Sequence, residues 1–146
     1  MKINCAIVDD EYLARTYLKE YIKKIPFLEL KGDFNSALKV MDLIKNRQVD
    51  LLFLDIQMPD ISGLDFLKTL QTKPYIILTT AYKEYAIESY ELDVADYLLK
   101  PFSFDRFVKA VNKVMEKAEK SEKPAEQNQN NDETEKPKWN DNYLVI

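Results

Sequence analysis

Acidic, hydroxyl and lysine side chains follow four apolar runs of the sequence, and together they could carry out phosphoryl chemistry. Asp9 and Asp10 follow the first run, Asp55 follows the second, Thr80 ends the third and Lys100 follows the last. Three carboxylates held close together repel one another unless a cation lies among them. A lysine and a hydroxyl would neutralise and hydrogen-bond phosphoryl oxygens, which is most of what phosphoryl transfer requires.

The composition restricts the kind of site that the chain can build. It has no histidine and one cysteine, which argues against zinc, haem and iron–sulfur centres and excludes Ser-His-Asp and Cys-His triads. Its two glycines, Gly32 and Gly63, are too few for a P-loop or a Rossmann loop. A metal must therefore be held by oxygen. Magnesium fits, because it uses one or two carboxylates together with substrate phosphate.

Asp55 is the candidate nucleophile, and it would form an acyl phosphate. The unbroken apolar run before it predicts a strand buried on both faces, and ligands of open α/β sheets collect at the carboxyl ends of the strands. Each of the four signals also has an ordinary structural explanation. An Asp-Asp-Glu run suits a helix N-terminus, for example, and an aspartate after a strand commonly caps a turn. Their conjunction at one sheet edge favours the chemical interpretation.

The elements that must position these groups alternate between strands and helices. Apolar or alternating runs predict strands over residues 3–8, 27–34, 51–54, 75–78 and 94–99. Helical spacing predicts helices over residues 11–24, from an N-cap at Ser36 to residue 44, and over 63–70, 83–92 and 103–118. This alternation predicts an α/β fold with a parallel sheet covered by helices on both faces, so that all the carboxyl ends meet at one edge.

The overall composition is that of one soluble domain with a tail. The 146 residues are 46% hydrophobic and 32% charged, and no apolar run approaches the length of about 20 residues that spans a bilayer. Cys5 lies in an apolar run and is expected in the core of a reduced, cytoplasmic protein. The net charge of −4 argues against a nucleic-acid surface on these residues themselves.

The last part of the chain changes character. Residues 119–138 are almost entirely polar and predict a flexible linker. Residues 139–146, WNDNYLVI, turn apolar again. Because a linker ordinarily joins two parts, we expect a second domain to begin there; a disordered tail is the alternative.

The motifs resemble the receiver domain of bacterial two-component response regulators over residues 1–118. The acidic pair Asp9–Asp10, the segment D-I-Q-M-P-D-I-S-G that opens at Asp55, Thr80–Ala81 and Lys100–Pro101 occur in the order and spacing of that family. The resemblance implies a flavodoxin-like (βα)5 fold with strand order 2-1-3-4-5. It also implies that Asp55 accepts a phosphoryl group from a sensor histidine kinase in a Mg²⁺-dependent reaction.

The same resemblance assigns roles to individual residues. It implies that Asp10, Asp55 and the backbone carbonyl of Gln57 bind Mg²⁺, with Asp9 helping through a water molecule. Thr80 and Lys100 would contact the phosphoryl oxygens. Thr80 and Tyr97 would act as the conformational switch. Residues that shape the loops would be Met58, Pro59, Gly63 and Pro101, the last through a cis bond to Lys100, a form found in about 5–6% of X-Pro bonds.

Three segments resemble those of regulators whose output module is a LytTR-type DNA-binding domain. They are the initial DDE, the segment TTAYKEYAIESYELDVADYLLKPF and the linker. The resemblance implies a signalling switch that promotes only its own phosphorylation and dephosphorylation. DNA would be bound only through the output domain, and a homodimer could form through the face made by the fourth helix, the fifth strand and the fifth helix.

Two other functions stay open at this point. One is a phosphatase or phosphotransferase with an aspartyl phosphate, like haloacid-dehalogenase-type hydrolases. Those carry a D-x-D pattern at the nucleophile, whereas Gln57 stands at the second acidic position here. The other is an interaction module that never carries phosphate.

Overall fold

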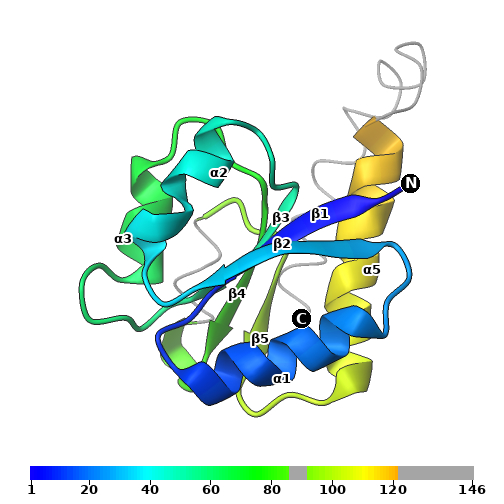
Figure 1. Ribbon diagram of the computed structural model, residues 1–146. Helices are drawn as coiled ribbons and strands as arrows, with labels where there is room; N and C mark the ends of the chain where they lie inside the picture. The colour runs from blue at the N-terminus through cyan, green and yellow to red at the C-terminus, as the bar shows by residue number, and fades with distance from the viewer. Residues whose placement is uncertain (86–91, 122–146) are drawn as a thin grey trace.

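The structure, a computed structural model, describes residues 1–85 and 92–121, and the fold is that of these residues. A parallel sheet runs through its centre in the order β2-β1-β3-β4-β5 (Figure 1). The predicted flavodoxin-like α/β fold and its strand order are therefore confirmed. The strands are β1 (Ile3–Val8), β2 (Leu28–Phe34), β3 (Leu51–Asp55), β4 (Tyr75–Thr80) and β5 (Asp96–Leu99).

Helices cover both faces of the sheet. One face packs against α1 and α5, and the other packs against α2 and α3 (Figure 1). The helices are α1 (Tyr12–Lys23), a 3₁₀ turn η1 (Ala37–Val40) that leads into α2 (Met41–Lys45), α3 (Gly63–Thr69) and α5 (Phe104–Ser121). The helix predicted over residues 83–92 falls largely on residues 86–91, which lie outside the described part of the chain.

Several boundaries differ from the predictions by one residue or more, for example that of β4, which runs to Thr80. The helix after Ser36 begins as a 3₁₀ turn, with the Ser36 side chain accepting a hydrogen bond from the Leu38 N–H. Strand β5 begins at Asp96, two residues later than predicted. Helix α5 continues to Ser121, whose hydroxyl donates to the Ala118 carbonyl at 2.9 Å. The first three residues of the predicted linker, 119–121, are thus helical, because polar residues are compatible with an exposed helical turn. Residues 122–146 lie outside the described range.

The strand that precedes Asp55 is the most buried part of the sheet. Every residue of β3 is buried, and the side chains alternate between two apolar clusters. Phe53 stacks on Phe107 of α5 with ring centroids 5.4 Å apart, whereas Leu52 and Leu54 pack on the side of α2 and α3. Each large side chain buried in this way contributes about 1.5–3 kcal/mol. This packing fixes β3 firmly and with it the position of Asp55.

A buried ion pair joins α5 to β5. It was not predicted from the sequence. The Asp96 side chain is 1% exposed and accepts hydrogen bonds of 2.9 and 3.0 Å from the Arg106 guanidinium. Lys113 lies 3.4 Å from the same carboxylate. The Arg106 side chain also donates to the Tyr97 carbonyl at 2.9 Å. A buried carboxylate needs such partners, since an unpaired one would strongly destabilise the fold.

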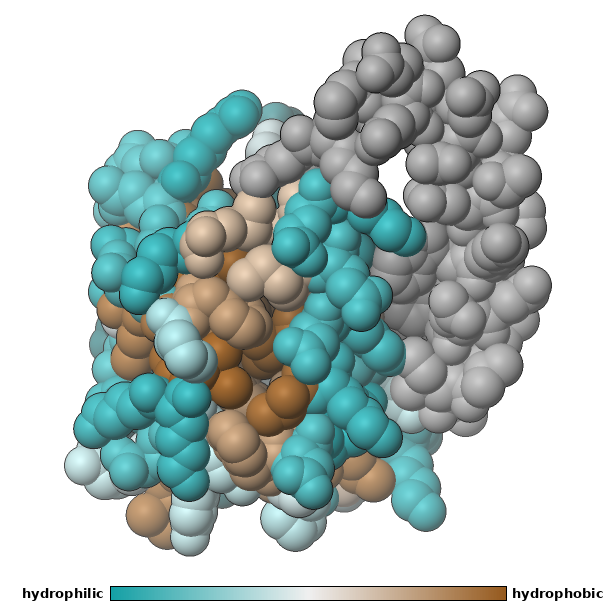
Figure 2. All heavy atoms as spheres, turned by 90° about the vertical axis from the view of Figure 1, so that its right-hand side faces the viewer, coloured by the Kyte–Doolittle hydropathy of each residue, from teal (hydrophilic) through white to brown (hydrophobic). Residues whose placement is uncertain are grey.

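The face on which α5 lies carries apolar side chains at the surface. Figure 2 shows them as a band between hydrophilic margins. Partly buried residues that pack against the core on the side of α1 and α5 include Tyr21, Phe102, Phe104, Val108 and Met115. Within residues 1–85 and 92–121, no helix has the length and hydropathy needed to cross a membrane.

Cys5 is predicted to be unreactive in the folded protein. Its side chain is fully buried in β1, and burial raises the pKa of the thiol to about 12. Because the thiolate is the reactive form, we expect negligible labelling by a disulfide reagent such as dithionitrobenzoate at neutral pH. Labelling should become complete after unfolding in urea. Prompt labelling of the native protein would contradict this burial.

Candidate functional site

Three carboxylates meet at the carboxyl edge of the sheet. The side chains of Asp9, Asp10 and Asp55 offer oxygen atoms that all lie within 4.8 Å of one another. Val8 of β1 is in register with Leu54 of β3, so the residues that follow them emerge side by side. Asp9 is 0% and Asp55 4% exposed, whereas Asp10 is exposed. The parallel topology thus brings the acidic groups together as the sequence predicted.

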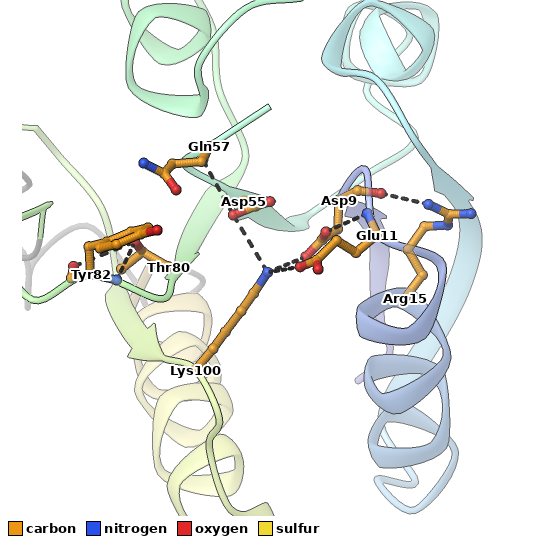
Figure 3. Close-up of polar contacts among 8 residues, drawn as sticks. All are labelled: Asp9, Glu11, Arg15, Asp55, Gln57, Thr80, Tyr82 and Lys100. Carbon is orange, nitrogen blue, oxygen red and sulfur yellow. Dashed lines mark hydrogen bonds and ion pairs between the residues drawn. The ribbon is translucent and has the colours of Figure 1, made fainter. Parts of the chain in front are cut away.

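Lys100 reaches the acidic cluster from the end of β5 (Figure 3). Its Nζ atom lies 2.8 Å from Asp9 Oδ2, 3.5 Å from Glu11 Oε1 and 3.6 Å from Asp55 Oδ1. Burial acts to lower the pKa of the ammonium group, but the hydrogen bond to Asp9 and the charges of Asp55 and Asp9 raise it overall. Lys100 therefore stays charged and pairs chiefly with Asp9. Its peptide bond to Pro101 is cis.

Asp9 also stabilises the turn that begins α1. Its Oδ1 atom accepts a hydrogen bond of 2.9 Å from the Glu11 N–H, while Oδ2 accepts from Lys100. Glu11 occupies the N-cap position of α1 without a capping bond from its own side chain. The same acidic residues thus serve both the start of the helix and the charged site, so both interpretations of the run apply.

The surroundings of Asp55 shift the pKa of its carboxyl group to near neutral pH. Burial, followed by the charges of Asp9 and Asp10, raises its pKa to about 7 overall. Lys100 and the Gln57 N–H, which donates to Asp55 Oδ1 at 3.3 Å, act in the opposite direction. A buried aspartate beside other acids disfavours its own ionised form unless positive charge is added.

This raised pKa predicts a pH-dependent stability difference between the wild type and Asp55→Asn without metal. The native state favours protonated Asp55, whose pKa is about 7 when folded and about 3.9 when unfolded. The stability that protonation provides is full below the unfolded value and is lost as pH rises through 7. From about pH 4 to pH 8, the stability of Asp55→Asn should rise by about 4 kcal/mol relative to that of wild type. Urea denaturation in EDTA measures this, and a difference constant with pH would contradict it.

Gly63 lets the loop after Asp55 fold back against it. A Cβ atom at this position would lie 2.3 Å from the Asp55 carbonyl oxygen and 3.0 Å from the Ile56 Cα. The Gly63 N–H donates to the Ile56 carbonyl at 2.7 Å. In the same loop Met58 is partly buried against the core and Pro59 is exposed. The glycine is thus needed for close backbone approach beside the candidate nucleophile.

Neither Thr80 nor Tyr97 forms a hydrogen bond with Asp55 in the part of the chain that the structure describes. The Thr80 hydroxyl is fully buried and accepts a hydrogen bond of 3.0 Å from the Tyr82 N–H (Figure 3). Tyr97 is partly buried and packs against the apolar cluster between the sheet and α2 and α3. The structure thus joins Asp9, Asp55 and Lys100 directly and leaves Thr80 bound to its own loop.

A pocket of about 800 Å³ opens beside the cluster. Its lining includes Asp10, Asp55, Gln57, Lys100 and Tyr85. The Gln57 side-chain amide donates to the Tyr85 hydroxyl at 3.3 Å, which links the loop after β3 to the segment after β4. This contact could not be predicted from the sequence, because neither residue type signals a partner 28 positions away.

The donor set at this edge suits Mg²⁺. The candidate ligands are carboxylate oxygens, which are the hard donors that this ion prefers, and Asp10 and Asp55 both line the open pocket. Asp9 has both oxygens engaged by Lys100 and the Glu11 N–H. A bound dication would also relieve the repulsion that raises the pKa of Asp55.

Comparison with known proteins gives a consistent result. The model of the response regulator receiver domain matches residues 5–112. The transcriptional regulatory protein BtsR of Escherichia coli (strain K12) is 38% identical over 122 residues, which are 82% of this chain and 51% of BtsR. Protein MrkE of Klebsiella pneumoniae is 34% identical, covering 77% of this chain and 43% of MrkE. The chain spans about half the length of these curated relatives.

Solved structures agree with the fold. The crystal structure of the response regulatory domain of MrkE from Klebsiella pneumoniae is similar with a TM-score of 0.72 and 33% identity, covering 81% of this chain and 99% of that one. The receiver domain of AraT, a response regulator from Geobacillus stearothermophilus, has a TM-score of 0.72 and 32% identity, covering 84% of this chain and 100% of that one.

Proposed function

Since the chain belongs to the family of response regulator receiver domains, we propose that it accepts a phosphoryl group on Asp55 from a sensor histidine kinase. The observation that carries this proposal is the position of Asp55 at the carboxyl edge of β3, within reach of two further carboxylates and one lysine. The phosphorylated domain then switches conformation and controls an output domain.

We assign the proposed Mg²⁺ to Asp10, Asp55 and the backbone carbonyl of Gln57, with Asp9 acting through a water molecule. When bound, the ion would supply positive charge to the phosphoryl oxygens. The fit rests on the oxygen donors that line the pocket.

The chain's own residues then carry the transfer. An Asp55 carboxylate oxygen bonds to phosphorus as the bond from phosphorus to the donor's imidazole nitrogen breaks, which leaves an acyl phosphate and a free imidazole. Lys100 lies 3.6 Å from Asp55 and provides positive charge for a phosphoryl oxygen. Thr80 exchanges its bond with Tyr82 for one with the phosphoryl group, and Tyr97 moves inward.

The output is proposed to be transcriptional. BtsR and YpdB of Escherichia coli are named transcriptional regulatory proteins, and about half of their length has no counterpart in this chain. We infer that residues 119–138 contain the connection to a LytTR-type DNA-binding domain that begins within residues 139–146. DNA binding would belong to that domain alone. A homodimer through the fourth helix, β5 and α5, and a cytoplasmic location, complete the proposal.

The proposal is tested by incubating the protein with Mg²⁺ and acetyl phosphate and weighing it intact. We expect a gain of one phosphoryl group, prevented by EDTA and removed by hydroxylamine, which cleaves acyl phosphates. No gain in a folded sample that binds Mg²⁺ would count against phosphorylation and favour a plain interaction module. Sustained hydrolysis of p-nitrophenyl phosphate would instead indicate an enzyme rather than a switch.

A further inference from the structure

Arg15 connects helix α1 to the end of β1 beside the acidic cluster. Its Nη1 atom donates a hydrogen bond of 2.7 Å to the backbone carbonyl of Asp9. Figure 3 shows the guanidinium directed from α1 toward this carbonyl, on the opposite side of Asp9 from Lys100. The Arg15 side chain is 15% exposed, so the contact is well shielded from water.

A second anchor fixes the orientation of this guanidinium. Arg15 Nε donates to Asp33 Oδ2 of β2 at 3.2 Å. The same oxygen lies 3.1 Å from Lys19 Nζ, one helical turn further along α1. Because the guanidinium is planar and its donors are rigidly spaced, holding Nε on Asp33 aims Nη1 at the Asp9 carbonyl. Arg15 thus bridges α1, β1 and β2.

The Asp9 carbonyl belongs to the peptide bond that continues into Asp10. Peptide bonds are planar, so a hydrogen bond to this oxygen restricts the orientation of the whole unit from Asp9 to the Cα of Asp10. The Asp9 N–H is itself bound to the Phe34 carbonyl at 3.0 Å. Asp10 is exposed and therefore depends on this backbone for its direction.

We propose that Arg15 is a positioning residue for the proposed magnesium site. It contacts neither ion nor phosphate and acts by holding the Asp9–Asp10 peptide so that the Asp10 carboxylate faces Asp55. This inference rests on the proposed function, which supplies the ion. Outer-shell contacts of this kind typically change metal affinity by about 10–100-fold.

The loss of Arg15 would change the affinity for Mg²⁺ in opposite directions through its charge and through its positioning role. A cation near the acidic cluster repels Mg²⁺, so removing its charge alone would strengthen metal binding. Removing a positioning contact would weaken it. Asp33 pairs with both Arg15 and Lys19 and offsets part of their charge. The guanidinium lies on the opposite side of Asp9 from Lys100 and binds the Asp9 carbonyl, so we expect the positioning effect to dominate.

The test is a calorimetric titration with Mg²⁺ alone, at constant pH and ionic strength. Arg15→Ala should bind Mg²⁺ about tenfold more weakly than wild type. Lys19→Ala is the matched control, because it removes a positive charge from the same Asp33 oxygen and leaves the bond to the Asp9 carbonyl. Its affinity should equal that of wild type. Urea denaturation in EDTA shows how much of the change is a general loss of stability.

The outcomes separate this inference from the function on which it depends. If wild type binds no Mg²⁺, the metal assignment of the proposed function fails. If wild type binds and Arg15→Ala binds equally or more tightly, only the role of Arg15 is overturned. The same holds if Lys19→Ala weakens binding as much as Arg15→Ala. Should Arg15→Ala not fold, Arg15→Gln is titrated in its place with the same expectation.

Discussion

Asp55→Asn is expected to gain no phosphoryl group from acetyl phosphate under conditions in which wild type gains one. An amide lacks the anionic oxygen that must attack phosphorus, so the loss should be complete. The pair between Asp9 and Lys100, 2.8 Å apart, does not involve Asp55 and should hold the remaining site in place. Intact mass measured over a time course checks this expectation.

Asp60→Asn provides a matched control within the same loop. Asp60 is exposed, and its carboxylate accepts hydrogen bonds from the Ser36 hydroxyl at 2.5 Å and from the Ile61 N–H at 2.9 Å. This variant should be phosphorylated to the same extent as wild type. Labelling of Asp55→Asn to the wild-type level would place the acceptor elsewhere, and loss of labelling in both variants would indicate a disturbed loop.

Gly63→Ala is expected to destabilise the protein by about 3 kcal/mol or more. The added Cβ would lie 2.3 Å from the Asp55 carbonyl oxygen, which is backbone of the central strand and cannot move without disturbing the sheet. The φ angle of Gly63 is not positive, so the penalty comes from this contact alone. In an unobstructed helix the same substitution would stabilise by about 0.5–1 kcal/mol. Urea denaturation measures the difference.

Gly32→Ala is the control for this second prediction. Its Cβ would meet ring atoms of Phe34 at 3.0 and 3.1 Å, and these belong to the end of a partly buried side chain in edge strand β2. A small ring displacement should relieve the contact, so we expect a change within about 1 kcal/mol. If the two glycine variants lost equal stability, the backbone contact at Gly63 would not be the cause.

The fold could be predicted because its signals are local. The apolar run before Asp55 and the alternation of strands and helices need only neighbouring residues, and parallel topology then brings the strand ends together. The sequence also located the acidic residues and Lys100, since each lies at the end of a strand or within two residues after it. Boundaries were less well predicted: α5 runs on to Ser121 because its exposed turns have no apolar signal to mark their end.

The pairing of individual side chains could not be predicted. Lys100 lies closer to Asp9 than to Asp55, at 2.8 against 3.6 Å, and only the packed geometry decides between them. The Arg106–Asp96 pair and the contact of Arg15 with the Asp9 carbonyl were missed for the same reason. A charged residue within a predicted buried strand, as Asp96 is, is a signal that could have pointed to a partner.

The Thr80 hydroxyl accepts a hydrogen bond from the Tyr82 N–H and donates one of 3.5 Å to the Tyr82 carbonyl, so the proposed movement of Thr80 exchanges this donated bond for one to the phosphoryl group. A neutral hydrogen bond contributes about 1 kcal/mol and one to a charged group about 1.5–3 kcal/mol, so the net gain at Thr80 is on the order of 1 kcal/mol. Such a gain changes a population ratio by only about fivefold. The threonine would therefore contribute little to the free-energy difference between the two conformations, and a larger bias toward the phosphorylated conformation would have to arise at the charged groups.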